Sequence, residues 1–380
     1  MNLFAFDDAA CERLAREGTP LFAYSLAAAE TQYRSLREAL PPRVRLAYAM
    51  KANPHPRLLR LFADLGASFD CASAGELARV ADLAPGRILY AGPGKRTAEL
   101  DLALSLGVRV QAEGWEDLER LERLAPGPVA VNLRVHPGSG IQEGSPIIGG
   151  TGPSAFGVDE EDLPALLLRA AGLRKVAIRG LHVFAASNER DASRLLATHR
   201  HVMGMARLLQ EALGAPLEQV DLGGGLGIPY AAGEMPLDVA VLGRGLEELL
   251  AACPWFTGEL ILEPGRFLAG PCGVYLTRVT RVKESRGVRF VILEGGVNHL
   301  LRPLLTGQPF PTRAVAAGGA RRPATLAGPL CTSLDRLGDV DLPELAPGSL
   351  LAMGMAGAYG FTEAMTPFLS HPAPREVWEA

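Results

Sequence analysis

The chain has few cysteines, and nothing in their arrangement suggests that they pair. The five cysteines are an odd number, are widely spaced and include no CxxC pair. This pattern argues against a disulfide framework and against a structural zinc site, so we expect no metal centre. We also expect the protein to work in the reducing environment of the cytoplasm, because free cysteines are usual there.

Long apolar runs and a strong charge of one sign are missing as well. No run of about 18 apolar residues appears, so no transmembrane span and no membrane partner are expected. The N-terminal segment MNLFAFDDAACERLAREG is acidic and mixed, unlike a signal peptide. The formal net charge of −4 does not suggest a nucleic-acid partner.

The length leaves room for more than one domain. The chain has 380 residues, whereas a β/α barrel typically takes about 250. Its apolar fraction of 48% and charged fraction of 21% are ordinary for a globular protein that buries a large core. No short internal repeat, low-complexity tract or long linker interrupts the sequence.

Short apolar runs alternate with helical patterns over the first two thirds of the chain, which is typical of βαβ units and a parallel sheet. Eight runs are predicted to be strands: 45–51, 68–71, 87–91, 108–112, 129–135, 177–184, 219–222 and 259–263. Helical patterns occupy 56–65, 74–83, 115–124, 161–171 and 192–212. Eight β/α repeats predict a closed barrel, with a doubly wound open sheet as the alternative.

The pattern changes after Arg266. Alternating runs at 274–282, 288–293 and 349–355 are separated by glycine and proline turns, with little helix between them. They predict an antiparallel β domain. The segment PLFAYS, which begins at Pro20, is predicted to be a strand that pairs with this sheet. The expected domains are therefore a barrel at 26–266 and a β domain made of 1–25 and 267–380.

Polar and glycine residues cluster where the predicted barrel strands end, which is where the active sites of such barrels lie. These positions hold Lys51, Asp70, Glu76, Glu113, Arg134, His182, Phe184, Ser187, Gly223, Gly224, Gly225, Glu263 and Arg266. Each alone has an ordinary explanation, such as a surface lysine, a turn or a helix cap. Their placement at one rim favours a common site.

The chemistry of these residues indicates a pyridoxal phosphate site. A lysine facing a barrel interior can form a Schiff base, because desolvation and nearby cations lower its pKa. Three successive glycines expose backbone N–H groups that suit a phosphate. A carboxylate beside a pyridine nitrogen keeps that nitrogen protonated, and an aromatic side chain can stack on the ring.

Seven segments then resemble a known family: YAMKANP (48–54), SFDCASAGEL (68–77), GLHVFAASN (180–188), DLGGGLGIPY (221–230), LEPGRFL (262–268), GPLCTSLD (328–335) and MAGAYGF (355–361). The chain resembles the fold-type III pyridoxal phosphate enzymes, which include alanine racemase and the ornithine and diaminopimelate decarboxylases. It is more similar to the decarboxylases. The resemblance implies an α/β fold with an alanine racemase-like (β/α)8 barrel, a C-terminal antiparallel β domain and a head-to-tail homodimer with shared sites.

The resemblance also implies residue roles. Lys51 is expected to carry the cofactor covalently, and Glu263 to pair with its ring nitrogen. The phosphate is expected to be held by Gly223, Gly224, Gly225, Arg266, Ser187 and Tyr359. Asp70, Glu76, Arg134 and His182 match positions near the cofactor. Cys331, supplied by the opposite subunit, is expected to protonate the carbanion that remains after CO2 leaves. Arg302, Thr332, Asp335 and Tyr359 are the expected substrate contacts.

Two positions depart from the diaminopimelate decarboxylases. Phe184 stands where they place a histidine that stacks on the ring, so stacking is kept but a titratable group is lost. Thr332 stands where they place an acidic residue that helps to hold the distal ammonium of the substrate. In contrast, VNHLLRPLL (297–305) resembles those enzymes, whose arginine at this position meets a substrate carboxylate. Arg302 is the corresponding candidate here.

The tail AMTPFLSHPAPREVW (364–378) and the motif CTSLD (331–335) resemble a sub-branch that acts on glutamyl groups held on acyl carrier proteins or on amino-acid conjugates of siderophore pathways. The leading prediction is therefore a decarboxylase that removes the α-carboxyl group of an L-amino acid or an amino-acyl conjugate, in a siderophore or secondary-metabolite pathway. Its substrate is expected to be a small molecule or to be bound to a carrier protein. Diaminopimelate decarboxylase in lysine biosynthesis is the main alternative, and an amino-acid racemase is a third. A non-catalytic protein that only binds pyridoxal phosphate is a fourth, against which Lys51, Glu263 and Cys331 argue.

Overall fold

In the computed structural model, which describes residues 2–138 and 152–379, the strands form two separate sheets. The chain divides into two units. The barrel unit comprises Tyr33–Gly227 and Leu237–Gly265, and the β unit comprises Met1–Gln32, Ile228–Pro236 and Arg266–Ala380. The expected barrel domain, 26–266, differs from the barrel unit mainly at its N-terminal end and at the segment 228–236.

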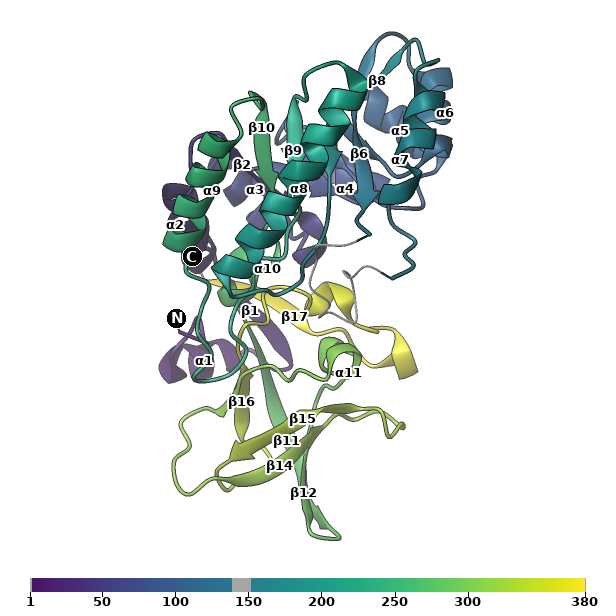
Figure 1. The fold of residues 1–380 in the computed structure, drawn as a ribbon. Helices are drawn as coiled ribbons and strands as arrows, with labels where there is room; N and C mark the ends of the chain where they lie inside the picture. The colour runs from purple at the N-terminus through teal and green to yellow at the C-terminus, as the bar shows by residue number, and fades with distance from the viewer. Residues whose placement is uncertain (1, 139–151, 380) are drawn as a thin grey trace. The chain divides into compact units, whose positions relative to one another are not determined.

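Eight parallel strands form the closed barrel of the first unit (Figure 1). They are β2 (Val44–Ala49), β3 (Ser68–Cys71), β4 (Ile88–Tyr90), β5 (Arg109–Ala112), β6 (Val129–His136), β8 (Val176–His182), β9 (Gln219–Asp221) and β10 (Glu259–Leu262). Neighbours pair in the order β5-β4-β3-β2-β10-β9-β8-β6, and β5 also pairs with β6. That last pairing closes the barrel, so the prediction of a barrel is confirmed and the open sheet is excluded. The short β7 (Val158–Asp159) pairs with β6.

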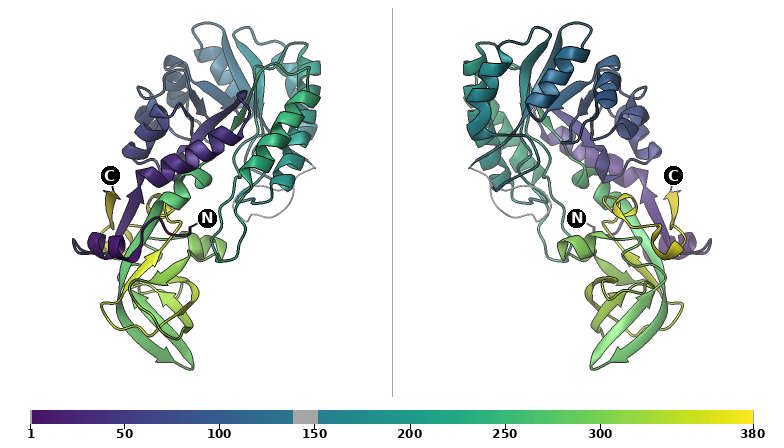
Figure 2. Two further views of the ribbon diagram at one scale, coloured as in Figure 1. Left: turned by 90° about the vertical axis from the view of Figure 1, so that its left-hand side faces the viewer. Right: turned by 90° about the vertical axis from the view of Figure 1, so that its right-hand side faces the viewer.

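Helices surround the barrel strands (Figure 1, Figure 2). They are α2 (Leu26–Ala39), α3 (Pro56–Asp64), α4 (Ala74–Val80), α5 (Thr97–Ser105), α6 (Trp115–Leu124), α7 (Leu163–Ala170), α8 (Ala192–Leu213) and α9 (Val239–Ala252), with the 3-10 turns η1 (Met50–Ala52) and η2 (Glu160–Asp162). Their ends carry the expected caps: Ser73 accepts from Glu76 N to begin α4, and Gly214 adopts a left-handed conformation after α8. The helices cover the strands, which accounts for the nearly continuous apolar runs of β2 and β10.

The β unit is built on one eight-stranded sheet. Its strands are β1 (Leu21–Ser25), β11 (Gly273–Ser285), β12 (Val288–Leu293), β13 (Thr312–Ala314), β14 (Arg322–Ala327), β15 (Arg336–Leu342), β16 (Leu350–Met353) and β17 (Arg375–Glu379). Strand β11 pairs antiparallel with β1, β12 and β16, which confirms that the segment after Pro20 joins this sheet. Two pairings, β1 with β17 and β12 with β14, are parallel, so the sheet is mostly rather than wholly antiparallel.

Short helices complete the β unit: α1 (Asp8–Ala15), α10 (Arg266–Ala269), α11 (Arg302–Thr306), η3 (Gly270–Cys272), η4 (Phe361–Glu363) and η5 (Phe368–Ser370). Its buried core joins α1 to the sheet, with Cys11 packed among Leu21, Leu276 and Leu350. Within the described residues, no helix is long and apolar enough to cross a membrane.

Two predicted strands end two residues earlier in the structure than in the sequence prediction. Lys51 lies in η1, which follows β2 directly, and β8 ends at His182, so Phe184 lies in the following loop. The apolar patterns continue past the last ladder hydrogen bond because the chain remains buried there, as at Met50 and Val183. Lys51, in η1, and Phe184, in the loop after β8, therefore both lie just beyond the C-terminal ends of barrel strands.

Candidate active site

Lys51 and Phe184 lie together at the barrel rim. The Lys51 ammonium is 5.0 Å from the centroid of the Phe184 ring. Lys51 is exposed and Phe184 is half-buried. An accessible amine beside an aromatic face is an arrangement that can bind an aldehyde on a planar ring and stack on that ring.

The glycine loop after β9 is pressed against its neighbours. Gly223 and Gly225 have positive φ values of +70° and +92°, and a Cβ on Gly224 would lie 2.6 Å from the carbonyl oxygen of Glu263. A Cβ on Gly225 would lie 2.8 Å from Ala186, next to the half-buried Ser187. Only glycine fits this turn, and such a turn exposes backbone N–H groups of the kind that bind phosphate.

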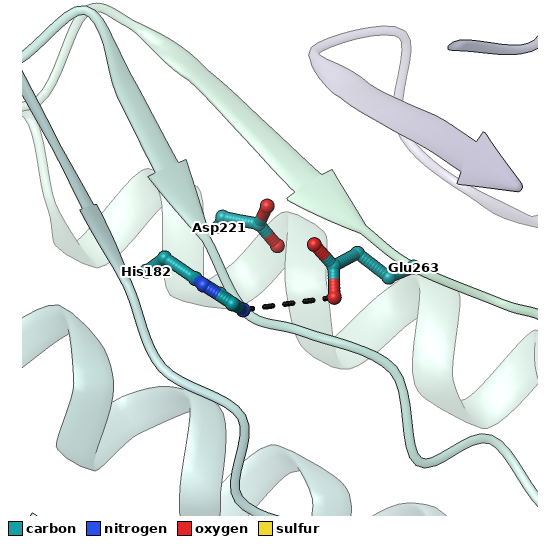
Figure 3. Close-up of side chains that lie close together, drawn as sticks. All are labelled: His182, Asp221 and Glu263. Carbon is teal, nitrogen blue, oxygen red and sulfur yellow. Dashed lines mark ion pairs between the residues drawn. The ribbon is translucent and has the colours of Figure 1, made fainter. Parts of the chain in front are cut away.

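A buried polar cluster lies where β8, β9 and β10 end. Figure 3 shows His182, Asp221 and Glu263 pointing toward one another, with His182 Nε2 3.6 Å from Glu263 Oε2. Gln111 Nε2 donates to Asp221 Oδ2 at 2.9 Å and to Glu263 Oε1 at 3.2 Å. Burial alone would raise the pKa of Glu263, but His182, the hydrogen bond with Asp221 and the Lys51 charge outweigh burial and lower it.

The residue types of this cluster also occur in metal sites, since one ligand atom each from His182, Asp221 and Glu263 lie within 4.8 Å of one another. The Gln111 amide, however, donates hydrogen bonds to both carboxyl groups. An N–H group directed at the same oxygens favours a hydrogen-bonded carboxyl pair over a cation. We therefore interpret the cluster as a hydrogen-bonded polar network near the C-terminal ends of the barrel strands.

Asp70 and Arg134 belong to the same rim but have different partners. Asp70 is buried, and burial together with the Glu263 charge raises its pKa to about 8, against the opposing effect of Lys51. Arg134 Nη1 donates to Glu113 Oε1 at 2.9 Å, and its guanidinium lies 4.6 Å from the centroid of Phe156. Arg134 is thus held by Glu113, while Asp70 interacts electrostatically with Lys51 and Glu263.

A second cluster of predicted site residues lies in the β unit. Arg266 Nη1 donates to the Tyr230 hydroxyl at 2.7 Å. The guanidinium groups of Arg266 and Arg302 lie 4.7 Å and 5.1 Å from the centroid of Tyr359, and Arg302 Nη1 is 3.6 Å from Glu363 Oε2. Tyr359 has a φ of +55°, which is uncommon for a residue other than glycine and marks a conformation fixed by its surroundings.

The loop between β14 and β15 carries the remaining candidates. Cys331 is exposed, and the Thr332 hydroxyl accepts a hydrogen bond from Leu334 N at 3.2 Å. Asp335 is only 3% exposed, and its two oxygens accept from Val297 N and Leu330 N, each at 2.7 Å. Asp335 therefore holds the backbone next to Cys331, and direct contact of Asp335 with a substrate stays a prediction.

The structure adds four residues that the sequence did not single out. Gln111 and Asp221 complete the buried cluster of the barrel, and Tyr230 and Glu363 are partners of Arg266 and Arg302. Asp221 and Tyr230 stand at the two ends of the motif DLGGGLGIPY. Gln111 is a polar residue near the end of an apolar strand, which is a recognisable signal in a barrel. Glu363 has no such signal.

The residues gathered in the barrel unit fit pyridoxal phosphate. They provide an amine for the aldehyde, an aromatic face for the ring, a glycine loop for the phosphate and a buried, ionised carboxyl group for the ring nitrogen. The glycine loop and the Glu263 backbone are also in contact with each other. A site of this composition has each of the groups that the cofactor requires.

Comparison with known proteins identifies the family. The family model described as "Pyridoxal-dependent decarboxylase, pyridoxal binding domain" matches residues 26–270. The chain is 33% identical to the L-glutamyl-[BtrI acyl-carrier protein] decarboxylase of Niallia circulans, covering 94% of this chain and 88% of that protein. It is 34% identical to the diaminopimelate decarboxylase of Methanothermobacter thermautotrophicus, covering 95% and 86%.

A solved structure agrees with these relatives. The crystal structure of diaminopimelate decarboxylase from Helicobacter pylori complexed with L-lysine superposes with a TM-score of 0.88 at 29% sequence identity, covering 97% of this chain and 94% of that one. The expected fold, cofactor and class of reaction are thereby confirmed. The chain belongs to the pyridoxal-dependent decarboxylases, and its cofactor is pyridoxal phosphate.

Proposed function

We propose that this enzyme decarboxylates the α-carbon of an L-amino acid or amino-acyl conjugate whose far end carries no free ammonium group. A glutamyl group on a carrier protein, or an amino-acid conjugate of a siderophore or secondary-metabolite pathway, is the substrate class we favour. The observation that carries this proposal is Thr332, the residue after Cys331. A threonine hydroxyl cannot form an ion pair with a distal ammonium.

The barrel unit supplies most of the residues proposed to hold the cofactor, and the β unit supplies Arg266 and Tyr359. Lys51 would bind its aldehyde, Phe184 would stack on its ring and Glu263 would face the ring nitrogen. The phosphate would be held by Gly223, Gly224, Gly225, Ser187, Arg266 and Tyr359. Bound pyridoxal phosphate acts as an electron sink for the pair of electrons left at the α-carbon when CO2 departs. The buried, ionised state of Glu263 supports this assignment.

Cys331 is proposed to deliver the proton that replaces CO2 at the α-carbon. Its thiol is exposed, and the backbone beside it is fixed by hydrogen bonds to Asp335. We also infer a homodimer in the cytoplasm, in which Cys331 of one subunit serves the Lys51 site of the other. The free state of all five cysteines supports a reducing compartment.

The surroundings of Arg302 support a substrate whose far end carries no net charge. Arg302 is buried, and its guanidinium already has Glu363 as a counter-ion at 3.6 Å. A substrate carboxylate would compete with Glu363 for this arginine, whereas a neutral acyl or amide group would leave the pair intact. The relative named as L-glutamyl-[BtrI acyl-carrier protein] decarboxylase, which is 33% identical, is consistent with this reading.

Diaminopimelate decarboxylation is the second candidate. It is supported by Arg302, a buried cation beside Tyr359 that could meet a distal carboxylate, and by relatives named as diaminopimelate decarboxylases. This reading requires Glu363 to take over the role of the missing acidic residue at position 332. The two candidates therefore differ in what the far end of the substrate must carry.

A screen of CO2 release by the purified holoenzyme separates the two candidates. It should include carrier-bound glutamate, citrate-linked amino acids, free glutamate, lysine, ornithine and meso-diaminopimelate. Loss of a buried charge partner costs roughly 3–5 kcal/mol, so we expect lysine, ornithine and meso-diaminopimelate to react about two to four decades more slowly than the best conjugate. Turnover of meso-diaminopimelate at about 10⁴ M⁻¹s⁻¹ or more would make lysine biosynthesis the better assignment.

A further inference from the structure

Asp221 and Glu263 are two buried carboxyl groups that share one hydrogen-bond donor. Their exposed fractions are 0% and 3%. Gln111 Nε2 donates to one oxygen of each, at 2.9 Å and 3.2 Å, and Figure 3 shows the two carboxyl groups facing each other. Two ionised carboxylates in contact and away from water would repel strongly, so the pair must hold a proton.

The groups around the pair decide which carboxyl carries that proton. Glu263 faces His182 at 3.6 Å and is attracted by the Lys51 ammonium, and together with the hydrogen bond to Asp221 these effects lower its pKa. Asp221 is desolvated and faces the negative charge of Glu263. Burial first and that charge second raise its pKa, against the opposing N–H donors of Gly223 and Gln111.

The hydrogen-bond partners of Asp221 are compatible with a protonated carboxyl. Asp221 Oδ1 accepts from Gly223 N and Oδ2 accepts from Gln111 Nε2, each at 2.9 Å, and the side chain is also hydrogen-bonded with Glu263. A protonated carboxyl has one O–H donor and keeps acceptor capacity, whereas an ionised one only accepts. Only the protonated form can donate to Glu263 and accept from the glycine loop at once.

We propose that Asp221 carries the proton of this pair and acts as a positioning residue for Glu263. It keeps the Glu263 carboxylate ionised and fixed for the ring nitrogen of pyridoxal phosphate. Asp221 also accepts a hydrogen bond from Gly223 N, in the loop proposed to hold the phosphate. One side chain would therefore position both the carboxylate opposite the ring nitrogen and the phosphate loop. The inference rests on the proposed role of Glu263 opposite the ring nitrogen.

Infrared difference spectroscopy of the holoenzyme tests the position of the proton. The C=O stretch of a protonated carboxyl is separate from the bands of ionised carboxylates. We expect the wild type minus Asp221→Asn spectrum at pH 7 to show a protonated-acid band, and the wild type minus Glu263→Gln spectrum to show ionised-carboxylate bands. Asp70→Asn, which removes a second buried acid of the barrel rim with a raised pKa, is the matched control for the band assigned to Asp221. The reverse assignment, with carboxylate bands lost in Asp221→Asn, would overturn the proposal.

Cofactor retention gives a second, independent readout. Asparagine has the donor and acceptor that the protonated acid uses, and the Gln111 amide can turn to meet it, because Gln111 Oε1 has no hydrogen-bond partner among the described residues. Leucine has neither group. Since a hydrogen bond to a charged group contributes roughly 1.5–3 kcal/mol, we expect the dissociation constant for pyridoxal phosphate to rise about tenfold or more in Asp221→Leu. In Asp221→Asn it should change by less than about threefold.

The two variants distinguish positioning from simple packing. Equal weakening of cofactor binding in Asp221→Asn and Asp221→Leu would contradict the proposal, because loss of the titratable proton alone would then be as harmful as loss of both hydrogen bonds. Neither readout uses an amino-acid substrate, so an error in the substrate assignment does not affect the result. An error in the role of Glu263 would appear instead as an unchanged visible spectrum of the bound cofactor in Glu263→Gln.

Discussion

Removing the counter-ion of Arg302 should change which substrates the enzyme prefers. Arg302 Nη1 and Glu363 Oε2 are 3.6 Å apart, and the two side chains are 8% and 25% exposed. In the wild type this arginine is neutralised within its own chain. The Glu363→Gln substitution keeps the size of the side chain but leaves the Arg302 charge available, so a substrate with an anionic far end should gain a partner.

The size of this effect follows from the geometry. At about 4 Å and an effective dielectric constant of about 20, two unit charges attract by roughly 4 kcal/mol. Glu363 is partly exposed, and water competes for its carboxylate, so the coupling that a substrate can recover is smaller, about 1–2 kcal/mol. This corresponds to roughly a 5- to 30-fold change in preference.

The assay compares kcat/KM for L-glutamate and L-glutamine, which differ at the far end only in charge. The ratio of glutamate to glutamine should rise by roughly 5- to 30-fold in Glu363→Gln. Glu284→Gln is a matched control, because Glu284 also pairs with an arginine of the β unit but in an exposed pair with Arg322. That control should leave the ratio within about twofold of the wild type.

A ratio that stays at the wild-type value in Glu363→Gln, in an enzyme that still binds its cofactor, would refute the reasoning. It would mean that Arg302 does not sense the charge of the far end of the substrate. A ratio that falls would indicate that Glu363, and not Arg302, contacts that end. Arg302→Met should lower the glutamate preference of the Glu363→Gln enzyme again if the freed arginine is the cause.

Three further outcomes follow from the same account. Cys331→Ala should slow turnover strongly, keep pyridoxal phosphate bound and increase wrongly protonated, transaminated cofactor, whereas clean product at the normal rate would rule out the proton-donor role. When the Cys331→Ala enzyme is mixed with inactive Lys51→Ala, up to about a quarter of the activity should return if sites are shared between subunits. Thr332→Glu should improve activity on ornithine or lysine relative to the native substrate, as measured by competing CO2 release. Burial lowers the pKa of His199 from 6.5 to about 4. As the pH falls, the unfolded chain therefore binds the proton before the folded chain does, and stability is lost between pH 6.5 and pH 4. The free energy of unfolding of the wild type should fall by about 2 kcal/mol between pH 7 and pH 5 because of this group. His199→Gln should remove that loss, and His201→Gln, on the same helix, should retain it.

The barrel could be predicted from the sequence because its strands are buried on both faces. Such strands appear as continuous apolar runs between helical patterns, and β3 and α6 have the predicted bounds. Strands β14 and β15 escaped prediction because they alternate apolar residues with arginine, threonine and aspartate, a pattern that resembles a polar loop. β12 and β14 pair in parallel, and no local sequence pattern indicates that these two separate segments become neighbours.

The site was partly predictable for a related reason. Lys51, the glycine triplet and Glu263 end strands or follow them, so the topology alone places them at one rim. Asp221 is the last residue of β9 and Gln111 the last but one of β5, where a polar residue is easily taken for the ordinary end of an apolar run. The Arg302–Glu363 pair joins α11 to η4, across a stretch of chain whose path depends on the packing of the whole sheet.

Chemical trapping shows which lysine carries the cofactor, and we expect it to be Lys51. The chain has four lysines, of which Lys95 pairs with Asp117 at 3.0 Å and Lys175 donates to Ala125 O. Borohydride reduction of the holoenzyme followed by peptide mapping should place the pyridoxyl mass on Lys51, with loss of the visible absorbance. The same mass on Lys95, Lys175 or Lys283, with Lys51 unmodified, would contradict the account.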